Sequence, residues 1–260
     1  MLYISFAQNL TLTIIMCLFA YLIGSIPNGL WVGKKFKGID IRNYGSGNIG
    51  TTNSIRVLGK KLGFFVFALD VIKGMLAIFI VEFVLEPLDV MDSLIPYIIY
   101  GLCSIFGHAF SIFLKFKGGK SVAASLGVVI ILTPIPALSC LLVFGIVLVL
   151  TGYVCLCSTA ATITVVSTAW ILHFFGMDSG WILETVPLYL CIVYTIVGCF
   201  LIYKHKSNFI RLYHGEENCF KKKKKKIVYS EPKDYFPEDI RKKYEVGEYN
   251  TDDKEKSEEN

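Results

Sequence analysis

The stretch Asp40–Asn53, DIRNYGSGNIGTTN, interrupts an otherwise apolar chain, and the rest of the sequence is arranged around it. Its glycines at positions 45, 47 and 50 permit unusual backbone dihedrals and a close approach to a ligand. Hydroxyl and amide side chains stand between two arginines here: Ser46, Asn48, Thr51, Thr52 and Asn53, flanked by Arg42 and Arg56. Successive backbone N–H groups beside arginine suit a phosphate. The alternative is a plain polar loop between two helices.

The composition places this loop in a membrane protein. Of 260 residues, 54% are hydrophobic and 18% charged, and the mean hydropathy of +0.56 exceeds that of soluble domains. Several runs of about 18 to 20 apolar residues are long enough to cross a bilayer core. We therefore predict an all-α membrane domain over residues 1–217 and a charged, disordered cytoplasmic tail over 218–260. The eight cysteines show no metal-ligand spacing, so we expect free thiols, no metal and no cofactor.

Seven membrane spans are predicted, with the N-terminus outside and the C-terminus in the cytoplasm. The run 122–151 is too long for one span and contains Pro134 and Pro136, which indicates a hairpin of two short helices. The other spans cover about 10–32, 62–85, 93–114, 158–175 and 185–203, and the first of them is interrupted before its end by Gly24-Ser25-Ile26-Pro27.

The distribution of lysine and arginine supports this count. The outer connections 86–92, 134–136 and 176–184 contain neither residue. If the run 122–151 were a single span, the total would be six spans and the lysine run 221–226 would lie outside. The inner loops and the C-terminal end contain Lys34, Lys35, Lys37, Arg42, Arg56, Lys60, Lys61, Lys115, Lys117, Lys120, Lys204, Lys206 and Arg211.

A second glycine-rich segment, Phe116–Ser121 (FKGGKS), leads into the hairpin. It resembles the end of a nucleotide P-loop, but that motif needs a glycine where this chain has Leu114. Glycines before a helix that begins near a lysine still make a generic phosphate cradle. The alternative is a basic anchor at the membrane edge.

Two other patterns contain titratable residues within or beside the spans. Asp70 and Lys73 are three residues apart, so on one helix they share a face and can pair to brace the site. His173 and Asp178 match the H-x-x-x-x-D dyad of another class of glycerolipid acyltransferases. Because the predicted topology puts this dyad outside, away from basic residues, we treat it as a chance match.

Three separated segments together resemble the bacterial integral-membrane acyl-phosphate:glycerol-3-phosphate acyltransferases over residues 10–217. The first comprises Gly24-Ser25-Ile26-Pro27, Asp40-Ile41-Arg42, Gly45-Ser46-Gly47-Asn48, Thr52-Asn53 and Arg56. The second comprises Gly107-His108 and Phe116 to Ala123. The third comprises His205 to Leu212, followed by Gly215 and Glu216.

The resemblance implies a reaction and a setting. Acyl phosphate and the 1-hydroxyl of sn-glycerol 3-phosphate would give lysophosphatidate and inorganic phosphate, in phospholipid biosynthesis at the cytoplasmic face of the bacterial cell membrane. Both substrates, membrane lipids and a soluble or peripheral enzyme that makes acyl phosphate are the expected partners. Nucleic acid is not expected.

The resemblance and the phosphate chemistry together give the candidate site. The expected catalytic residues are Ser46, Arg56, Lys120, His205 and Asn208. Substrate and phosphate binding is assigned to Arg42, Gly45, Gly47, Asn48, Asn53, Gly118, Gly119, Ser158 and Arg211. Arg56 and Lys120 would hold phosphates and offset charge on the leaving group. His205 would act as a base or as a hydrogen-bond donor, and a substrate phosphate is the other candidate proton acceptor.

The chain departs from the family pattern at several positions. Gly152 and Cys155 stand where arginine and serine are common, Ser121 replaces a glycine, and Phe209 replaces an isoleucine. These departures put fine positioning in doubt. The hexalysine run either attracts anionic lipid or is simply solvated.

Two other classes of protein are alternatives to a membrane acyltransferase. A small-anion transporter would need polar groups through an outer half that the sequence predicts to be apolar. A non-catalytic scaffold would not need the Gly/Asn/Ser/Arg loop.

Overall fold

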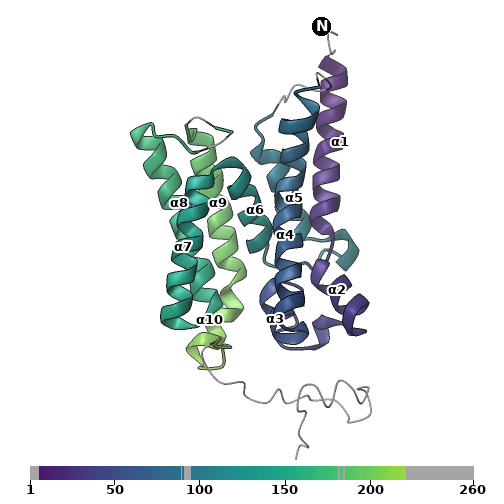
Figure 1. Ribbon diagram of the computed structural model, residues 1–260, viewed down its shortest axis with the longest axis vertical. Coiled ribbons are helices and arrows are strands. Elements are labelled where there is room, and N and C mark those ends of the chain that lie inside the picture. The colour runs from purple at the N-terminus through teal and green to yellow at the C-terminus, as the bar shows by residue number, and fades with distance from the viewer. Residues whose placement is uncertain (1–5, 89, 91–94, 181, 184, 221–260) are drawn as a thin grey trace, which may run out of the picture. The chain divides into compact units, whose positions relative to one another are not determined.

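The computed structural model describes residues 6–88, 90, 95–180, 182–183 and 185–220, and every regular element in these ranges is helical. The described residues up to Cys219 belong to one compact unit. The predicted charged tail lies outside the described residues from position 221 onward. Figure 1 shows the elements in chain order, which are α1 (Phe6–Ser25), α2 (Asn28–Lys37), η1 (Ile41–Asn43), α3 (Thr51–Leu58), α4 (Lys60–Ile80), η2 (Val81–Leu85), α5 (Ile98–Ala109), η3 (Ile112–Leu114), α6 (Val122–Leu132), α7 (Pro134–Thr151), α8 (Val154–Phe175), α9 (Leu188–Lys204) and α10 (Lys206–Tyr213).

The first apolar segment ends earlier than its sequence predicts. Helix α1 ends at Ser25, and α2 begins at Asn28 as a separate helix. Pro27 lacks a backbone N–H and disfavours helical dihedrals at the residue before it, so the chain breaks here. The interruption predicted at Gly24-Ser25-Ile26-Pro27 is therefore confirmed, whereas the predicted extension of the span to residue 32 is wrong.

The predicted break at the prolines of the fourth apolar run is confirmed. Helix α6 has 11 residues and α7 has 18, with Thr133 between them in a non-helical conformation. Pro134 occupies the first position of α7, where its missing N–H costs nothing. The fully buried Thr133 hydroxyl shares a hydrogen bond of 2.8 Å with the Tyr194 hydroxyl.

Four helical segments are long and apolar enough to cross a membrane: α1, α4 with η2, α7 and α8. Helices α9 and α10 form a bent pair, with an angle of 46°, that counts as a fifth segment if taken as one. Two shorter apolar segments, 98–114 and 122–132, accompany them. The protein is thus an all-helical membrane protein with four or five candidate spans among its described residues.

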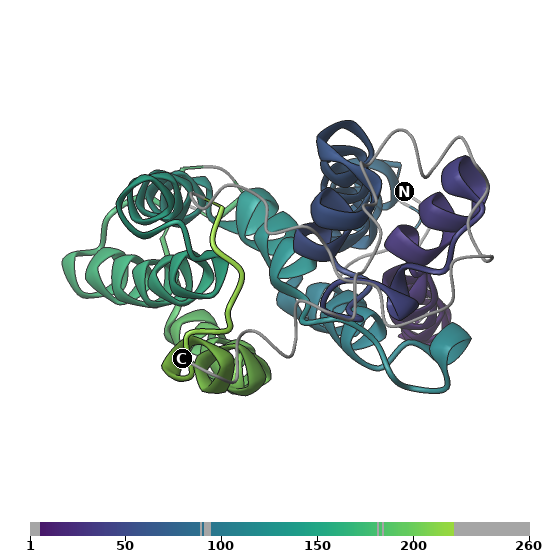
Figure 2. The ribbon, with the colours of Figure 1, turned by 90° about the horizontal axis from the view of Figure 1, so that it is seen from below.

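Glycines let the helices of the first part approach closely. Helix α1 packs on α5, and α4 packs on α6, an arrangement that Figure 2 shows along the helices. A methyl group on Gly24 would lie 2.3 Å from the Ser104 carbonyl oxygen, and one on Gly74 would lie 2.0 Å from the Ala124 carbonyl oxygen. Small residues at such crossings are typical of helices that pack within membranes.

A small apolar cluster holds the polar loop against the helices. Its centre is Ile41, which is fully buried next to Gly29 and Gly33 of α2. The same cluster includes Leu30, Val32, Ile49, Leu58, Val66 and Leu114. The loop is therefore anchored by its isoleucines, and its polar residues lie between those anchors.

Candidate active site

Asn53 organises the polar loop from within. Its side chain is 1% exposed, and its amide nitrogen donates toward the carbonyl oxygens of Ile41, Tyr44 and Asn48 at 2.8–3.1 Å. Its amide oxygen accepts from the Ser46 N–H at 2.9 Å. Both amide atoms of Asn53 are thus bonded to the loop backbone, and this side chain determines the shape of the loop.

Two of the three loop glycines have the conformation that the sequence suggests. Gly45 and Gly47 have φ of 62° and 69°, in the left-handed region that favours glycine. Gly50 instead has an extended conformation and caps α3. The loop thus turns twice before the helix that carries Arg56.

Arg42 is already paired within the loop. Its guanidinium donates to both carboxylate oxygens of Asp40, with Nη2 2.6 Å from Oδ2 and Nε 2.9 Å from Oδ1. This pairing lowers the pKa of the Asp40 carboxyl and raises the pKa of Arg42. A phosphate at Arg42 must therefore compete with a bidentate carboxylate.

The loop faces a cavity of about 720 Å³ that it shares with the second glycine-rich segment. Ser46, Gly47 and Asn48 line one side. Lys115, Lys117 and Gly118 line the other side, with Arg42, Ile49, Phe113 and Leu114 completing the wall. Two segments about 70 residues apart in the sequence thus meet at one basic, glycine-rich hollow.

Lys120 connects the second segment to the third. It lies just before α6, and its ammonium group donates a hydrogen bond to the Asn208 side-chain oxygen of α10. Burial lowers the pKa of Lys120 to about 8. The residue therefore remains mostly protonated at neutral pH and loses its charge within an accessible alkaline range.

Helix α10 brings two candidate residues to one carboxylate, and a third, His205, lies directly before the helix. Asn208 donates to Oε1 of Glu217 at 2.9 Å, and Arg211 donates to Oε2 at 2.9 Å. The Glu217 side chain is only 7% exposed. His205 is buried, and its Nδ1 lies 2.8 Å from the Leu201 carbonyl oxygen. Because a carbonyl can only accept, Nδ1 carries the proton and Nε2 remains for other partners.

Arg56 belongs to the same electrostatic cluster. It is half-buried on α3, and its charge interacts with those of Glu217 and Arg211. Burial lowers the pKa of its guanidinium, which nevertheless stays protonated in proteins. Glu217 was not among the predicted site residues, although the neighbouring Glu216 was noted as part of the third motif. Glu217 follows Arg211 by six residues and Asn208 by nine, and no local pattern distinguishes it from Glu216.

Helix α8 contributes its first turn. Ser158 is buried there, three residues after Cys155, which puts both on one helix face. The charges of Glu217 and Lys120 both act on the Cys155 thiol. The position where this chain departs from the family pattern thus lies against the charged cluster.

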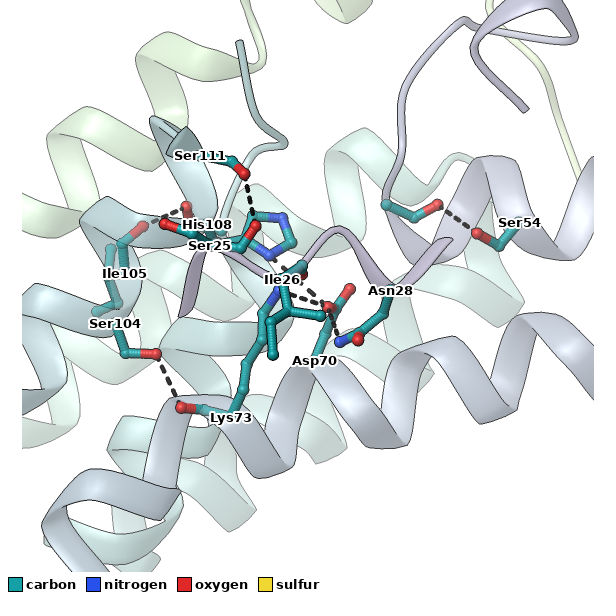
Figure 3. Close-up of polar contacts among 12 residues, drawn as sticks. Ser25, Ile26, Asn28, Ser54, Asp70, Lys73, Ser104, Ile105, His108 and Ser111 are labelled. Carbon is teal, nitrogen blue, oxygen red and sulfur yellow. Dashed lines mark hydrogen bonds and ion pairs between the residues drawn. The ribbon is translucent and has the colours of Figure 1, made fainter. Parts of the chain in front are cut away.

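The predicted Asp70–Lys73 pair is confirmed, with Nζ 2.9 Å from Oδ1 and the two side chains 4% and 2% exposed. Figure 3 shows that it joins α4 to the break between α1 and α2 and to His108 of α5. His108 lay in a quoted motif but received no role from the sequence.

The H-x-x-x-x-D residues lie apart from this cluster. His173 is near the C-terminal end of α8, whereas the site touches the N-terminal turn, a separation of roughly 27 Å at 1.5 Å per residue. His173 Nδ1 lies 2.8 Å from the Val186 carbonyl oxygen, and Asp178 accepts from the Gly180 N–H. Each side chain thus has a local backbone partner.

The fold and site define a helical integral membrane protein with a cationic, anion-suited cluster at one end of its helices. The family model for glycerol-3-phosphate acyltransferase matches residues 14–215. The glycerol-3-phosphate acyltransferase of Fusobacterium nucleatum is 45% identical over 203 residues, covering 77% of this chain and 94% of the relative. That of Bacillus subtilis is 42% identical over 206 residues, covering 78% and 95%. The chain therefore belongs to the glycerol-3-phosphate acyltransferase family, as its three motifs indicate.

Two solved structures share the fold. The crystal structure of PlsY (YgiH), an integral membrane glycerol 3-phosphate acyltransferase, in its glycerol 3-phosphate form matches with a TM-score of 0.68 at 36% identity. That match covers 80% of this chain and 95% of that one. The lysophosphatidic acid form matches with a TM-score of 0.66 at 34% identity, covering 80% and 94%.

Proposed function

We propose that the protein transfers an acyl group from acyl phosphate to the 1-hydroxyl of sn-glycerol 3-phosphate, which gives lysophosphatidate and inorganic phosphate. The observation that carries this proposal is the meeting of the three motifs. Lys120 contacts Asn208, Asn208 and Arg211 hold Glu217, and Arg56 lies within range of the same charges. Three cations surround one carboxylate, and the resulting excess of positive charge suits phosphate groups.

The cations have distinct roles in this reaction. Lys120 and the free N–H groups at the start of α6 can converge on one phosphate. Arg56 offers a bidentate fork, which lysine cannot reproduce. Because the acyl-phosphate bond is already activated, positioning and charge stabilisation suffice without a covalent enzyme intermediate. The cations offset the negative charge that grows on the departing phosphate.

The loop and α8 complete the binding surface. One wall of the cavity is formed by Ser46, Gly47 and Asn48, and the opposite wall includes Gly118. Gly45 and Gly119 adjoin these residues in the chain and complete the two glycine-rich turns. Ser158 lies one helical turn from the charged cluster. Arg42 joins them when a substrate phosphate displaces Asp40.

The proton of the attacking hydroxyl needs an acceptor. His205 uses Nδ1 on the Leu201 carbonyl, so its neutral form presents Nε2 as an acceptor. A phosphate oxygen of the substrate is the other candidate. Either route breaks the O–H bond as the ester forms and the acyl–phosphate bond breaks, so the reaction balances.

We further propose seven spans in the bacterial cell membrane, with the N-terminus outside and the site facing the cytoplasm. The charge distribution of the loops supports this orientation. Cysteines introduced at Lys61 and Lys206 should react with impermeant reagents only from the cytoplasmic side, and one at Asp178 only from outside. Labelling of position 178 from the cytoplasm would reverse the proposed topology at that loop.

A small-anion transporter is the competing function. The half of the molecule away from the site is not wholly apolar, contrary to the sequence prediction: Tyr97 donates to Glu86 at 2.7 Å, and Glu82 lies beside them. Between the two ends, however, Asp70 and Lys73 are buried and paired. A closed ion pair at this depth argues against an anion path through this helix group.

A donor assay tests the proposed reaction. Purified protein in detergent or liposomes should form lysophosphatidate from glycerol 3-phosphate and acyl phosphate. Acyl-CoA and acyl carrier protein are the matched alternative donors, and an enzyme that makes acyl phosphate would be the natural supplier. Product formed only from acyl-CoA would overturn the proposal.

A further inference from the structure

His108 lies between a buried carboxylate and the segment that carries Lys120. Its side chain is 4% exposed near the end of α5. One edge of the imidazole, at Nδ1, lies 3.7 Å from Oδ1 of Asp70. Figure 3 shows the ring directed toward this carboxylate.

The carboxylate itself is fixed from two elements. The Asn28 side chain of α2 donates to Oδ1 of Asp70 at 2.9 Å, and Lys73 lies 2.9 Å from the same oxygen. Lys73 also donates to the Ile26 carbonyl at 2.8 Å, in the break between α1 and α2. Asp70 is therefore held in place beside the ring, at a distance that is a packing contact and not a hydrogen bond.

The other edge of the ring supports Gly119. A methyl group on Gly119 would lie only 2.3 Å from His108 Nε2, so the ring touches the backbone and leaves no room for a side chain. The N–H groups of Gly118 and Gly119 donate to the carbonyls of Ala109 and His108 at 3.1 and 3.0 Å. The His108 ring and the carbonyl oxygens of His108 and Ala109 together fix the backbone of the two glycines.

This arrangement determines where the next residue points. Lys120 follows Gly119 directly, and its ammonium group reaches Asn208 on α10. Ser121, on the other side, donates from its hydroxyl to the Ile105 carbonyl at 2.9 Å. A shift of the glycine backbone would therefore move the lysine relative to α10.

We propose that His108, supported by Asp70, is a positioning residue for Lys120 and does not itself touch substrate. It sets the Gly118–Gly119 backbone so that the ammonium group meets both Asn208 and the substrate phosphate. The inference rests on the proposed function, because it takes Lys120 to be a phosphate ligand.

The glycines allow a compensation experiment. Gly119→Ala should lower kcat/KM by roughly a hundredfold, the scale for displacing a positioning group by about 1 Å. His108→Ala should lower it about tenfold, because it displaces the Lys120 ammonium group from the phosphate that this group stabilises. In the double variant the ring no longer collides with the new methyl group. Its kcat/KM should therefore exceed that of Gly119→Ala alone.

Gly118→Ala provides the matched control. A methyl group on Gly118 would lie 2.0 Å from the backbone carbonyl oxygen of His108, which no substitution at that residue removes. His108→Ala should therefore not rescue Gly118→Ala. Rescue of both glycine variants alike would overturn the proposal, because it would show a general loosening of the fold.

Further readouts separate positioning from other roles. KM and kcat are measured for glycerol 3-phosphate and for acyl phosphate, and Lys120→Ala identifies the substrate concerned. Adding His108→Ala to Lys120→Ala should have little further effect if the histidine acts through the lysine. Multiplicative losses, or a change in a kinetic parameter that Lys120→Ala leaves unaltered, would overturn the proposal.

Failure of the proposed function and failure of the positioning role give different results. Normal KM and turnover in Lys120→Ala would remove the lysine from the proposed function, whereas multiplicative losses remove only the positioning role. A lower unfolding midpoint in His108→Ala with unchanged KM and kcat would show a structural role alone and overturn the inference. If His108→Ala does not fold, His108→Asn keeps an amide toward Asp70 while withdrawing from Gly119, and the same kinetic change is expected.

Discussion

Two polar clusters lie among the apolar helices, and they differ in their charge balance. Asp70 and Lys73 form a one-to-one pair whose side chains are at most 4% exposed. At the site, Arg56, Lys120 and Arg211 share one carboxylate, Glu217. Buried charges are costly unless paired, so a closed pair serves structure. A surplus of cations that is only partly buried indicates a place for an anionic ligand.

The excess of positive charge at the site also affects the protonation of Lys120. Burial lowers the pKa of Lys120 to about 8, with the charge of Arg211 adding to the effect and that of Glu217 opposing it. A bound phosphate would oppose this shift by supplying the missing negative charge. The balanced cluster gains nothing from such a ligand. The comparison therefore predicts that substitutions in the two clusters change different measurable quantities.

Lys73→Met should have the largest effect, and it should fall on stability. The change leaves Asp70 buried without its cation, which costs about 3–5 kcal/mol. The measurement is the unfolding midpoint in detergent. As a control, Asp70→Asn with Lys73→Met removes both charges and should recover at least half of the loss. An unchanged midpoint in Lys73→Met would show that the pair is not structural.

Lys120→Ala should instead reduce turnover by about a hundredfold or more, the scale for losing one donor to a developing charge. Its unfolding midpoint should change little, because the lysine is one of several cations around Glu217. Initial rates are compared at saturating donor and acceptor for equally extracted protein. Lys61→Ala, an exposed lysine at the start of α4, is the matched control and should stay within twofold. Near-normal turnover in Lys120→Ala would mean that the site lies elsewhere.

Arg56→Lys keeps the charge and tests geometry. A lysine cannot offer two parallel N–H donors to a phosphate, so we expect a loss of about a hundredfold in turnover. The same rate assay measures it, and Arg56→Ala should be no more than modestly worse. A fully active Arg56→Lys variant would reduce the role of Arg56 to charge alone.

Sequence reasoning identified the segments of the site but not all of their contacts. The glycine, arginine and histidine patterns predict that Arg56, Lys120 and His205 lie on one side of the membrane, because loop charge controls topology. The contact between Lys120 and Asn208 joins residues 88 apart, and no local pattern specifies it. Glu217 could not be chosen over Glu216 because register at a helix end depends on tertiary packing.

In the fold, too, features set by local sequence were predictable and features set by tertiary packing were not. Prolines predicted the break before α7, because a missing N–H acts locally. Gly24-Ser25-Ile26-Pro27 predicted an interruption of the first span, but not a separate helix α2, because apolar residues resume after Pro27. What directs α2 away is the apolar cluster around Ile41, which depends on a loop folded back from later in the chain.

The pH dependence of kcat/KM should reflect the unbalanced cluster. With the pKa of Lys120 near 8 in the free enzyme, the ammonium group loses its proton as the pH rises above that value. kcat/KM should then fall about fivefold between pH 8 and pH 9. Phosphate monoesters are already dianionic there, with a second pKa of about 6, so the substrate does not cause the fall. Lys120→Arg, although slower, should show a flat profile. A sloping profile in that variant would assign the titration to another group.

His173→Ala should have the smallest effect. Its imidazole contacts the Val186 carbonyl at the far end of α8, so its loss should cost about 1 kcal/mol of stability. Activity should stay within a few-fold of the parent for equally extracted protein, since no charge of the site lies nearby. Asp178→Asn is the companion variant, because a true dyad would need both residues. If either substitution abolished turnover while the fold remained intact, the dyad would be the catalytic pair. The surplus of cations around Glu217 would then be a structural feature, and the comparison between the two clusters would lose its functional meaning.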